Sequence, residues 1–288
     1  MKDELYIRNM TRSEVDILVD WAAREGWNPG LHDAGVFWAA DPNAFIAAEV
    51  EGEMIGGGSI VSYGGEYGFM GFFIVRPESR SRGHGNELWH IRRQRLLDRL
   101  QPGASIGLDG VFTMQDYYAK GGFVFSHRNM RFRVEIPNHP DATTGSDIVT
   151  LDTVPLDEVL EYDRTCFPAS RRAFLEPWIT LPDSLALGCR RDGQLAGYGV
   201  VRRCREGCKI GPLFADDPGT AEDLYARLSA FAAGGPLFLD APENNPPAME
   251  LVRRHCMTEV FGCARMYLGP KPPVAEDRVF GVTTFELG

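Results

Sequence analysis

The chain has 288 residues, of which 44% are hydrophobic, and it carries 30 lysines and arginines against 40 aspartates and glutamates. This length predicts two ordinary domains or one large one, and the apolar content excludes a disordered chain. The formal net charge of -10 excludes a general coat for nucleic acid or for an anionic membrane, so we expect neither partner. A local basic site stays open.

Targeting and metal signals are weak in this sequence. No stretch approaches the roughly 18 to 20 consecutive apolar residues of a membrane helix, and the start is polar and acidic, so we expect a soluble, cytoplasmic monomer or homodimer. The six cysteines lie in the second half without a C-x-x-C, which predicts buried thiols. A zinc site could be formed by Cys204 and Cys208 together with Cys256 or His255. The spacing of these residues is a weak signal, and we expect no metal.

The first predicted elements are a strand over residues 5–10 and a helix that opens on a capping box and ends near Gly26. The glycines and proline that follow place Trp27, Asn28 and Asp33 on a loop. Such a loop either carries binding groups or is an exposed turn that Trp27 anchors by packing. The sequence leaves both readings open.

A β-rich region follows this loop. Three short runs separated by turns, at residues 44–50, 54–63 and 67–75, predict an antiparallel meander. The remaining predicted elements of this half are a helix over 86–100, a strand over 105–111, a short helix over 114–120 and one or two strands over 123–136.

Residues 137–146 are the only stretch that looks like a linker, and the order of elements then begins again. Residues 191–199 echo residues 50–58, with an offset of 141 residues between Gly52 and Gly193. We interpret this as a diverged duplication with domains at 1–136 and 147–288. The alternative is that any strand-turn-strand unit can place an acidic residue and a glycine in its turn.

The segment with the clearest chemistry joins a strand to a helix through Arg80-Ser81-Arg82-Gly83-His84-Gly85. Glycines at such a turn allow a close approach of the backbone to an anion, and the first turn of the helix presents unpaired N–H groups. Seven arginines but only three acidic residues lie between positions 76 and 99, against the acidic balance of the whole chain. The segment is neither a P-loop nor a G-x-G-x-x-G turn, and it predicts a site for a phosphorylated ligand.

Three patterns around this segment resemble the GNAT (GCN5-related N-acetyltransferase) superfamily. They are Val75-x-Pro77, Arg80-x-x-Gly83-x-Gly85, and a Tyr118-to-Phe123 segment similar to the family's Tyr-x-Lys-x-Gly-Phe. With the apparent duplication, the chain resembles the tandem members of the family. This resemblance implies an α+β fold of two GNAT domains, each a mixed, mostly antiparallel sheet flanked by helices, with acetyl-CoA (coenzyme A) as the acyl donor.

The resemblance also implies where the donor binds. Its pyrophosphate is expected on the loop and helix start, at Arg80, Ser81, Arg82, Gly83, His84, Gly85 and Asn86. Its pantetheine arm is expected to pair with the exposed backbone of Phe73, Ile74 and Val75. Many relatives have an asparagine seven residues before the tyrosine, where this chain has Val111. One contact to the donor is therefore missing or supplied elsewhere.

For catalysis, the resemblance implies that a backbone N–H near Val75 stabilises the oxyanion and that Tyr118 protonates the leaving sulfur. Tyr118 as a packing tyrosine, with Tyr117 in the functional role, is the alternative. A free amine has a pKa near 10, so a base should remove its proton at neutral pH. The sequence does not identify this base. Glu66 and Asp33 are the candidates, and the alternative for each is a free, solvated carboxylate.

The second half is predicted to have lost the donor site. Its strand over 209–216 leads into Asp217 to Leu224, which has no arginine and no paired glycines but three acidic side chains. We expect this copy to wall an acceptor pocket instead, with Asp240 and Glu243 holding a cationic amine alongside Trp27 and Asn28. A plain helix-capping turn is the alternative for the segment that contains Asp240 and Glu243. The end, residues 279–287, predicts a strand.

These features predict direct acetyl transfer to a primary amine of a small metabolite. Two alternatives stay open. The acceptor is a peptide or protein amine, which requires an open groove, or the protein is a non-catalytic regulator that binds acyl-CoA.

Overall fold

The computed structural model describes residues 4–138 and 147–288, which are called here the first half and the second half. Residues 139–146, most of the predicted linker, lie outside the described residues. Among the described residues no helix is long and apolar enough to cross a bilayer.

The first half builds an open sheet in the predicted order. Its strands are β1 (Leu5–Asn9), β2 (Phe45–Val50), β3 (Glu53–Tyr63), β4 (Tyr67–Val75) and β5 (Ser105–Val111). The first four are antiparallel neighbours, which confirms the meander, and β5 runs parallel to β4. Its helices are α1 (Arg12–Arg24), α2 (Asp33–Ala40), α3 (His84–Leu97) and α4 (Gln115–Lys120).

Two local predictions differ in outcome. Thr11 and Glu14 form the predicted capping box at the start of α1, where each side chain satisfies a backbone N–H of the other residue. The predicted loop ends earlier than expected, because Asp33 is the first residue of α2.

The second half repeats this plan. Its strands are β7 (Ile148–Thr150), β8 (Ser184–Arg191), β9 (Gln194–Arg203), β10 (Cys208–Ala215) and β11 (Pro236–Pro242), with β11 parallel to β10. Its helices are α5 (Leu156–Cys166), α6 (Arg172–Trp178), α7 (Pro218–Ser229) and α8 (Pro246–Arg254). The predicted final strand is wrong beyond residue 281, since only β13 (Val279–Gly281) is a strand there.

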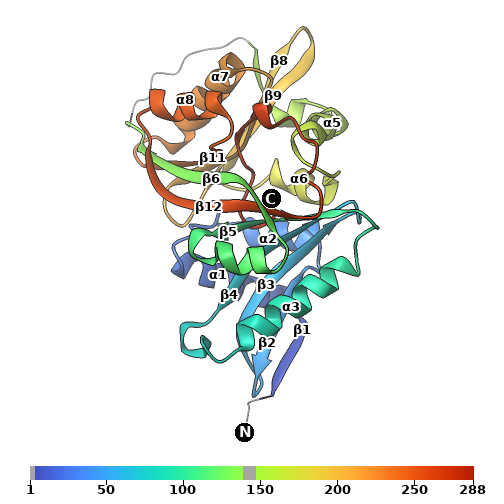
Figure 1. Cartoon of the computed structure of the whole chain (residues 1–288). Coiled ribbons are helices and arrows are strands. Elements are labelled where there is room, and N and C mark those ends of the chain that lie inside the picture. The colour runs from blue at the N-terminus through green and yellow to red at the C-terminus, as the bar shows by residue number, and fades with distance from the viewer. Residues whose placement is uncertain (1–3, 139–146) are drawn as a thin grey trace.

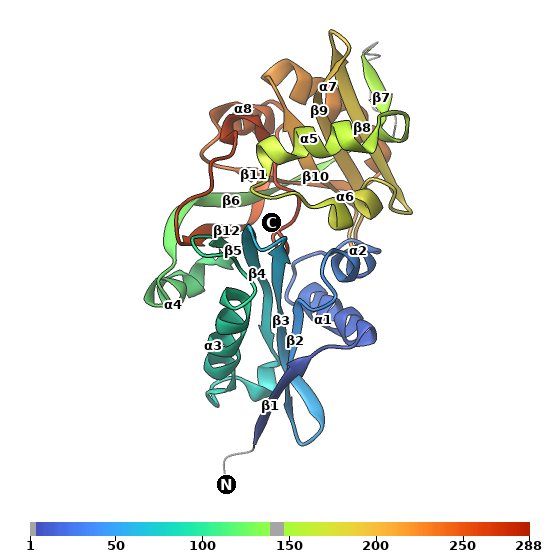
Figure 2. The same ribbon diagram turned by 90° about the vertical axis from the view of Figure 1, so that its right-hand side faces the viewer.

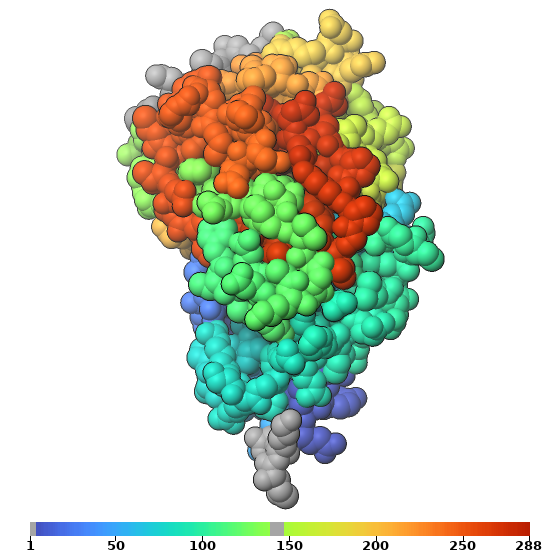
Figure 3. All heavy atoms as spheres, in the orientation of Figure 1, coloured from blue at the N-terminus to red at the C-terminus, as the bar shows by residue number. Residues whose placement is uncertain are grey.

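One pair of strands joins the two halves. The sheet order is β1-β2-β3-β4-β5-β12-β6-β11-β10-β9-β8-β7, in which β6 (Val124–Glu135) belongs to the first half and β12 (Thr258–Leu268) to the second. The strands β1 to β6 correspond in order to β7 to β12. When each strand is replaced by its counterpart, the sheet order is the same from both ends, as a duplication with a shared central pair requires. Figure 1 shows β6 and β12 side by side across the middle, and in Figure 3 the green and red surfaces of these segments meet there.

Helices cover both faces of the sheet in each half. Figure 2 shows α3 on one face of β2 to β4 and α1 on the other. In α3, Leu88 and Leu96 are buried, against the core around Met70 and Trp89. Between the halves, α2 contacts α6, and Phe37 stacks on Trp178 with their ring centroids 6.2 Å apart.

Candidate active site

A cavity lies where β4 and β5 separate. Their parallel pairing ends at Met70 and Leu108, after which β5 continues along β12. The gap is a cavity of about 510 Å³. It therefore opens beside the strand on which the sequence predicted the donor.

A bulge in β4 shapes this gap. Phe72 has a φ of 51°, and the pairing of β3 with β4 shifts register at this point, so β4 carries one extra residue here. The backbone beyond the bulge, from Phe73 to Val75, lines the cavity. Of the residues predicted to contact the donor, those that line the cavity are Phe73, Ile74, Val75, Arg80, Ser81, Gly85 and Asn86, whereas Arg82, Gly83 and His84 do not.

The first turn of α3 is open to an anion. Gly83 is its N-cap, with a φ of 92° that favours glycine, and no side chain caps the helix. A Cβ at Gly83 would meet no atom within 4 Å, so the space in front of the helix is free on this side. N–H groups at a helix start with no side-chain partner suit a phosphate oxygen, so this cradle fits the pyrophosphate of acetyl-CoA.

Arg80 and Arg92 of the basic segment line the cavity and have partners within the protein. Arg80 donates through Nε to the carbonyl oxygen of Val75 at 2.8 Å, and it pairs with Glu25 at the end of α1. Arg92 of α3 is fully buried, and its Nη2 donates to the carbonyl oxygens of Ser59 and Gly71. Burial lowers the pKa of Arg92 to about 10. Arg92 therefore fixes α3 against β3 and β4 beside the bulge.

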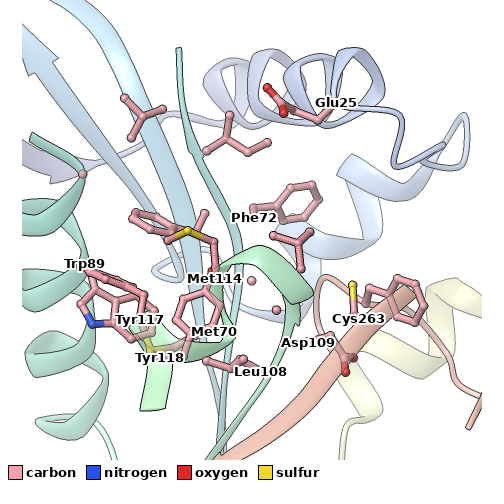
Figure 4. A pocket seen from close by; sticks show the side chains of 18 of the residues that line it. Glu25, Met70, Phe72, Trp89, Leu108, Asp109, Met114, Tyr117, Tyr118 and Cys263 are labelled. Atoms are coloured by element: carbon pink, nitrogen blue, oxygen red, sulfur yellow. The ribbon is translucent and has the colours of Figure 1, made fainter. Parts of the chain in front are cut away.

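Tyr118 lies on the wall of the cavity, at 6% exposure, with its ring centroid 5.0 Å from that of Trp89. Gly110 makes this position possible, because a Cβ there would stand 2.3 Å from the Tyr118 ring. Burial raises the pKa of Tyr118, so its hydroxyl stays protonated and is a proton donor. Figure 4 shows Trp89, Tyr117 and Tyr118 together on one side, with Asp109 and Cys263 on the other.

Neither predicted base faces this cavity. Glu66 lies in the turn between β3 and β4, where it pairs with Arg164 of α5 at 3.1 Å. Asp33 is 1% exposed and pairs with Arg202 of β9 at 2.9 Å, while it also accepts a hydrogen bond from the Gly30 N–H. Both carboxylates hold the two halves together, and neither is kept as the candidate base.

The residues that the sequence predicted to bind the acceptor do not lie together in the structure. Trp27 lines the cavity, whereas Asn28 is buried and exchanges two hydrogen bonds of 2.9 Å with the backbone of Glu206. Asp240 is buried in a bidentate pair with Arg131, and Glu243 accepts from a backbone N–H of β6 outside the cavity. Asp240 and Glu243 are therefore corrected to structural roles, since their partners occupy them away from the cavity.

Several residues that line the cavity were not predicted from the sequence. The second half contributes Phe261 and Cys263 from β12, and Phe285 and Glu286 from the segment after β13. Cys263 reaches the cavity because β12 takes the place beside β5, where it pairs with Val111. No sequence pattern within the first half predicts these residues, because they belong to the second half and reach the cavity only through the pairing of β12 with β5 and the path of the C-terminal segment.

The cysteines do not form a cluster. All six are free, and five are buried as predicted, whereas Cys256 is exposed. His255, a proposed zinc ligand, pairs with Glu222 at 2.6 Å. Over residues 4–138 and 147–288 no group of three or more His, Cys, Asp or Glu side chains is arranged to hold a metal ion.

Comparisons with known proteins agree with this geometry. A model described as "Acetyltransferase (GNAT) family" matches residues 12–121, and one described as "Acetyltransferase (GNAT) domain" matches residues 159–281. The chain is 29% identical over 277 residues to the holothin acyltransferase of Pseudoalteromonas sp. (strain SANK 73390), covering 96% of this chain and 92% of the relative.

Solved structures share the fold. A protein of Pyrococcus horikoshii superposes with a TM-score of 0.83 at 24% identity, covering 99% of this chain and 96% of that one. A tandem GNAT protein from the clavulanic acid biosynthesis pathway gives a TM-score of 0.62 at 15% identity, covering 93% and 100%. With one match to the family in each half and a repeated strand order, the chain belongs to the GNAT superfamily as a tandem member and is a transferase.

Proposed function

We propose that this chain moves the acetyl group of acetyl-CoA directly to a primary amine of a small metabolite. One observation carries the proposal: a single cavity is bounded by the free edge of β4, the uncapped start of α3, a protonated tyrosine and a wall from the second half.

The donor end of the cavity suits acetyl-CoA. The first turn of α3, from Gly83 to Asn86, would receive the pyrophosphate, and the backbone of Phe73 to Val75 would pair with the pantetheine arm. When bound, the donor supplies an activated thioester. The resemblance to the family supports this assignment, and so does the absence of a side-chain cap at Gly83.

The residues around the bulge would then assist direct transfer. A backbone N–H near Val75, a residue that lines the cavity, would stabilise negative charge on the acyl oxygen. Tyr118 would donate its proton to the departing sulfur, and its raised pKa keeps that proton available at neutral pH. The amine must lose a proton in the same reaction, so a carboxylate of the cavity is needed as well.

The acceptor end favours a small molecule. Phe261, Cys263 and Phe285 close the cavity from the second half, and its volume of about 510 Å³ is that of a pocket for a small ligand. The similarity to a relative named for the acylation of holothin supports acyl transfer as the reaction. A peptide acceptor would require an open groove at this wall.

The test is to incubate the purified protein with acetyl-CoA and panels of small primary amines and of peptides, and to follow thiol release. We expect turnover with members of the small-amine panel only. Turnover confined to peptides would favour the peptide alternative. Tight binding of CoA without turnover in any panel would favour the regulator and would reject the proposal.

A further inference from the structure

Three carboxylates line the cavity: Glu25, Asp109 and Glu286. Glu25 lies at the end of α1 and is paired with Arg80. Asp109 has a fully buried side chain that receives two hydrogen bonds from Arg265, at 2.8 and 2.6 Å, and one from Asn129 at 2.9 Å. Both carboxylates are therefore occupied by cations or amides of the protein.

Glu286 is different. It is 4% exposed, and no hydrogen bond to its carboxylate is found within the described part of the chain. Its backbone is fixed beside the bulge: the carbonyl oxygen accepts from Ser59 Oγ at 3.4 Å, and a Cβ at Gly71 would stand 1.9 Å from that oxygen. The residue therefore holds a carboxylate without a direct partner at the bulge of β4, on the wall of the cavity.

A layer of buried charge lies near Glu286. Lys209 of β10, Arg131 of β6 and Arg202 of β9 are the cations, and Asp33 of α2 and Asp240 of β11 are the other anions. Burial raises the pKa of Glu286 and Asp33 adds to the effect, while the three cations oppose it. Arg131 forms an ion pair with Asp240, and Arg202 forms one with Asp33. Lys209 donates a hydrogen bond to the carbonyl oxygen of Asn28 at 2.9 Å. A cation that enters the cavity would thus find Glu286 without a direct partner.

We propose that Glu286, carried into the first half by the segment that follows β13, binds the ammonium group of the acceptor and removes its proton for the transfer. This inference rests on the proposed function. The ammonium gives one proton to the Glu286 carboxylate and becomes the neutral amine. Its nitrogen forms the bond to the acyl carbon and then loses a second proton to solvent, while the carbon–sulfur bond breaks and the sulfur leaves with the proton of Tyr118.

The first test compares Glu286→Gln with Glu161→Gln, a matched change at an exposed position of α5 in the same half. We expect kcat of Glu286→Gln with the best amine of the panel to fall about 100-fold, with CoA affinity by calorimetry within twofold of wild type. Glu161→Gln should match wild type in both. An equal thermal transition for Glu286→Gln excludes misfolding as the cause.

The second test uses readouts that a purely structural glutamate would not move. Added formate should restore part of the activity of Glu286→Ala, because a small carboxylate can replace the missing base. In protein with 13C-labelled glutamate carboxylates and bound CoA, one signal should titrate above the usual glutamate range and be missing from Glu286→Gln. Absence of that signal, or of rescue, contradicts the base role.

Failure of the inference and failure of the proposed function are distinguishable. Wild-type turnover of an amine together with Glu286→Gln activity within threefold of it would overturn the inference alone. No wild-type turnover with any amine would overturn the proposed function and the inference with it.

Discussion

In the first half the gap between β4 and β5 is open, whereas the equivalent gap in the second half is filled by the chain itself. Pairing of β10 with β11 ends at Ile210 and Leu239, and β10 then pairs with β13 through Leu213 and Gly281. The tail also bonds to the other side of the gap, where the Val282 N–H donates to the carbonyl oxygen of Asp240 at 2.8 Å. β13 therefore occupies the place in which the first half offers a free strand edge.

The helix that follows this gap also differs between the halves, because its N-terminus is uncapped in the first half and capped in the second. The N-cap of α3 is Gly83, which offers no side-chain cap. The N-cap of α7 is Asp217, whose carboxylate accepts from the N–H groups of Gly219 and Thr220 at 2.8 and 3.0 Å. The N–H groups that would bind an anion in the first half are thus satisfied by an internal anion in the second.

The position of Tyr118 differs too. The N–H of Phe123 donates to the carbonyl oxygen of Tyr118, and the N–H of Met257 donates in the same way to Val252, with a residue of positive φ before each donor. Val252 therefore stands where the first half has its tyrosine. The comparison teaches that the second copy has lost all three features of the donor site, and that the tail filling its gap goes on to supply Phe285 and Glu286 to the first half.

The largest expected effect comes from removing the filling of the second gap. Phe280 of β13 is 1% exposed, so Phe280→Ala should lower the free energy of unfolding by about 3–5 kcal/mol and also reduce turnover, since Glu286 follows it in the chain. Denaturant unfolding and thiol release measure the two effects. Phe125→Ala, at a 42% exposed position, is the control and should change stability by less than about 0.5 kcal/mol. An unchanged stability in Phe280→Ala would show that β13 does not fill the gap tightly.

A charge reversal at the donor loop comes next. Arg80→Glu should weaken acetyl-CoA binding by about 100-fold, or about 2.7 kcal/mol, because it removes the tie to Val75 and places a carboxylate beside Glu25 and the phosphates. Arg191→Glu, the matched reversal at an ion pair of the second half, should leave binding unchanged. Calorimetry that gave equal losses for both variants would contradict a donor site in the first half alone.

Tyr118→Phe is expected to have a smaller effect on catalysis. The ring stays packed on Trp89, so CoA affinity should hold, while kcat falls by about 10- to 100-fold through loss of the proton donor. Because burial raises the pKa of Tyr118, the donor stays protonated as pH rises, and wild-type kcat should show no alkaline decline from this group below about pH 10. If Tyr117→Phe instead carried the loss in kcat, the assignment would move to Tyr117.

The smallest effect concerns the capped helix. Asp217→Ala should lower stability by about 1 kcal/mol without altering acetyl-CoA binding. Burial opposes ionisation of Asp217, but hydrogen bonds from Thr220 and Gly219 outweigh it and lower its pKa. A lowered carboxyl pKa contributes stability above the unfolded value near 3.9, and this stability is lost as pH falls through the folded value. The variant should therefore lose less stability on acidification than wild type does in the same unfolding titration.

The sequence predicted what is local. The meander and the loop before α3 depend on turns and glycines within a few residues, and the structure places both as expected. It missed α2, whose residues Asp33–Ala40 are mostly apolar all round and lack a helical period. Glu66 and Asp33 looked like free carboxylates because their arginine partners lie 98 and 169 residues further along the chain. Glu286 was not predicted either, because only the path of the C-terminal segment after β13 brings it to the first half.

The exchange of β6 and β12 has a consequence for how the protein is made. Within the described residues β5 pairs with β4 and β12, so the place beside β5 stays empty until residues 258–268 have been synthesised. Until then β5 lacks the partner that it has in the folded protein on this side, and an unpaired strand edge is in general a site at which chains pair with one another. Completion of the sheet couples the folding of both halves into one late event, slow because its contacts are distant in sequence.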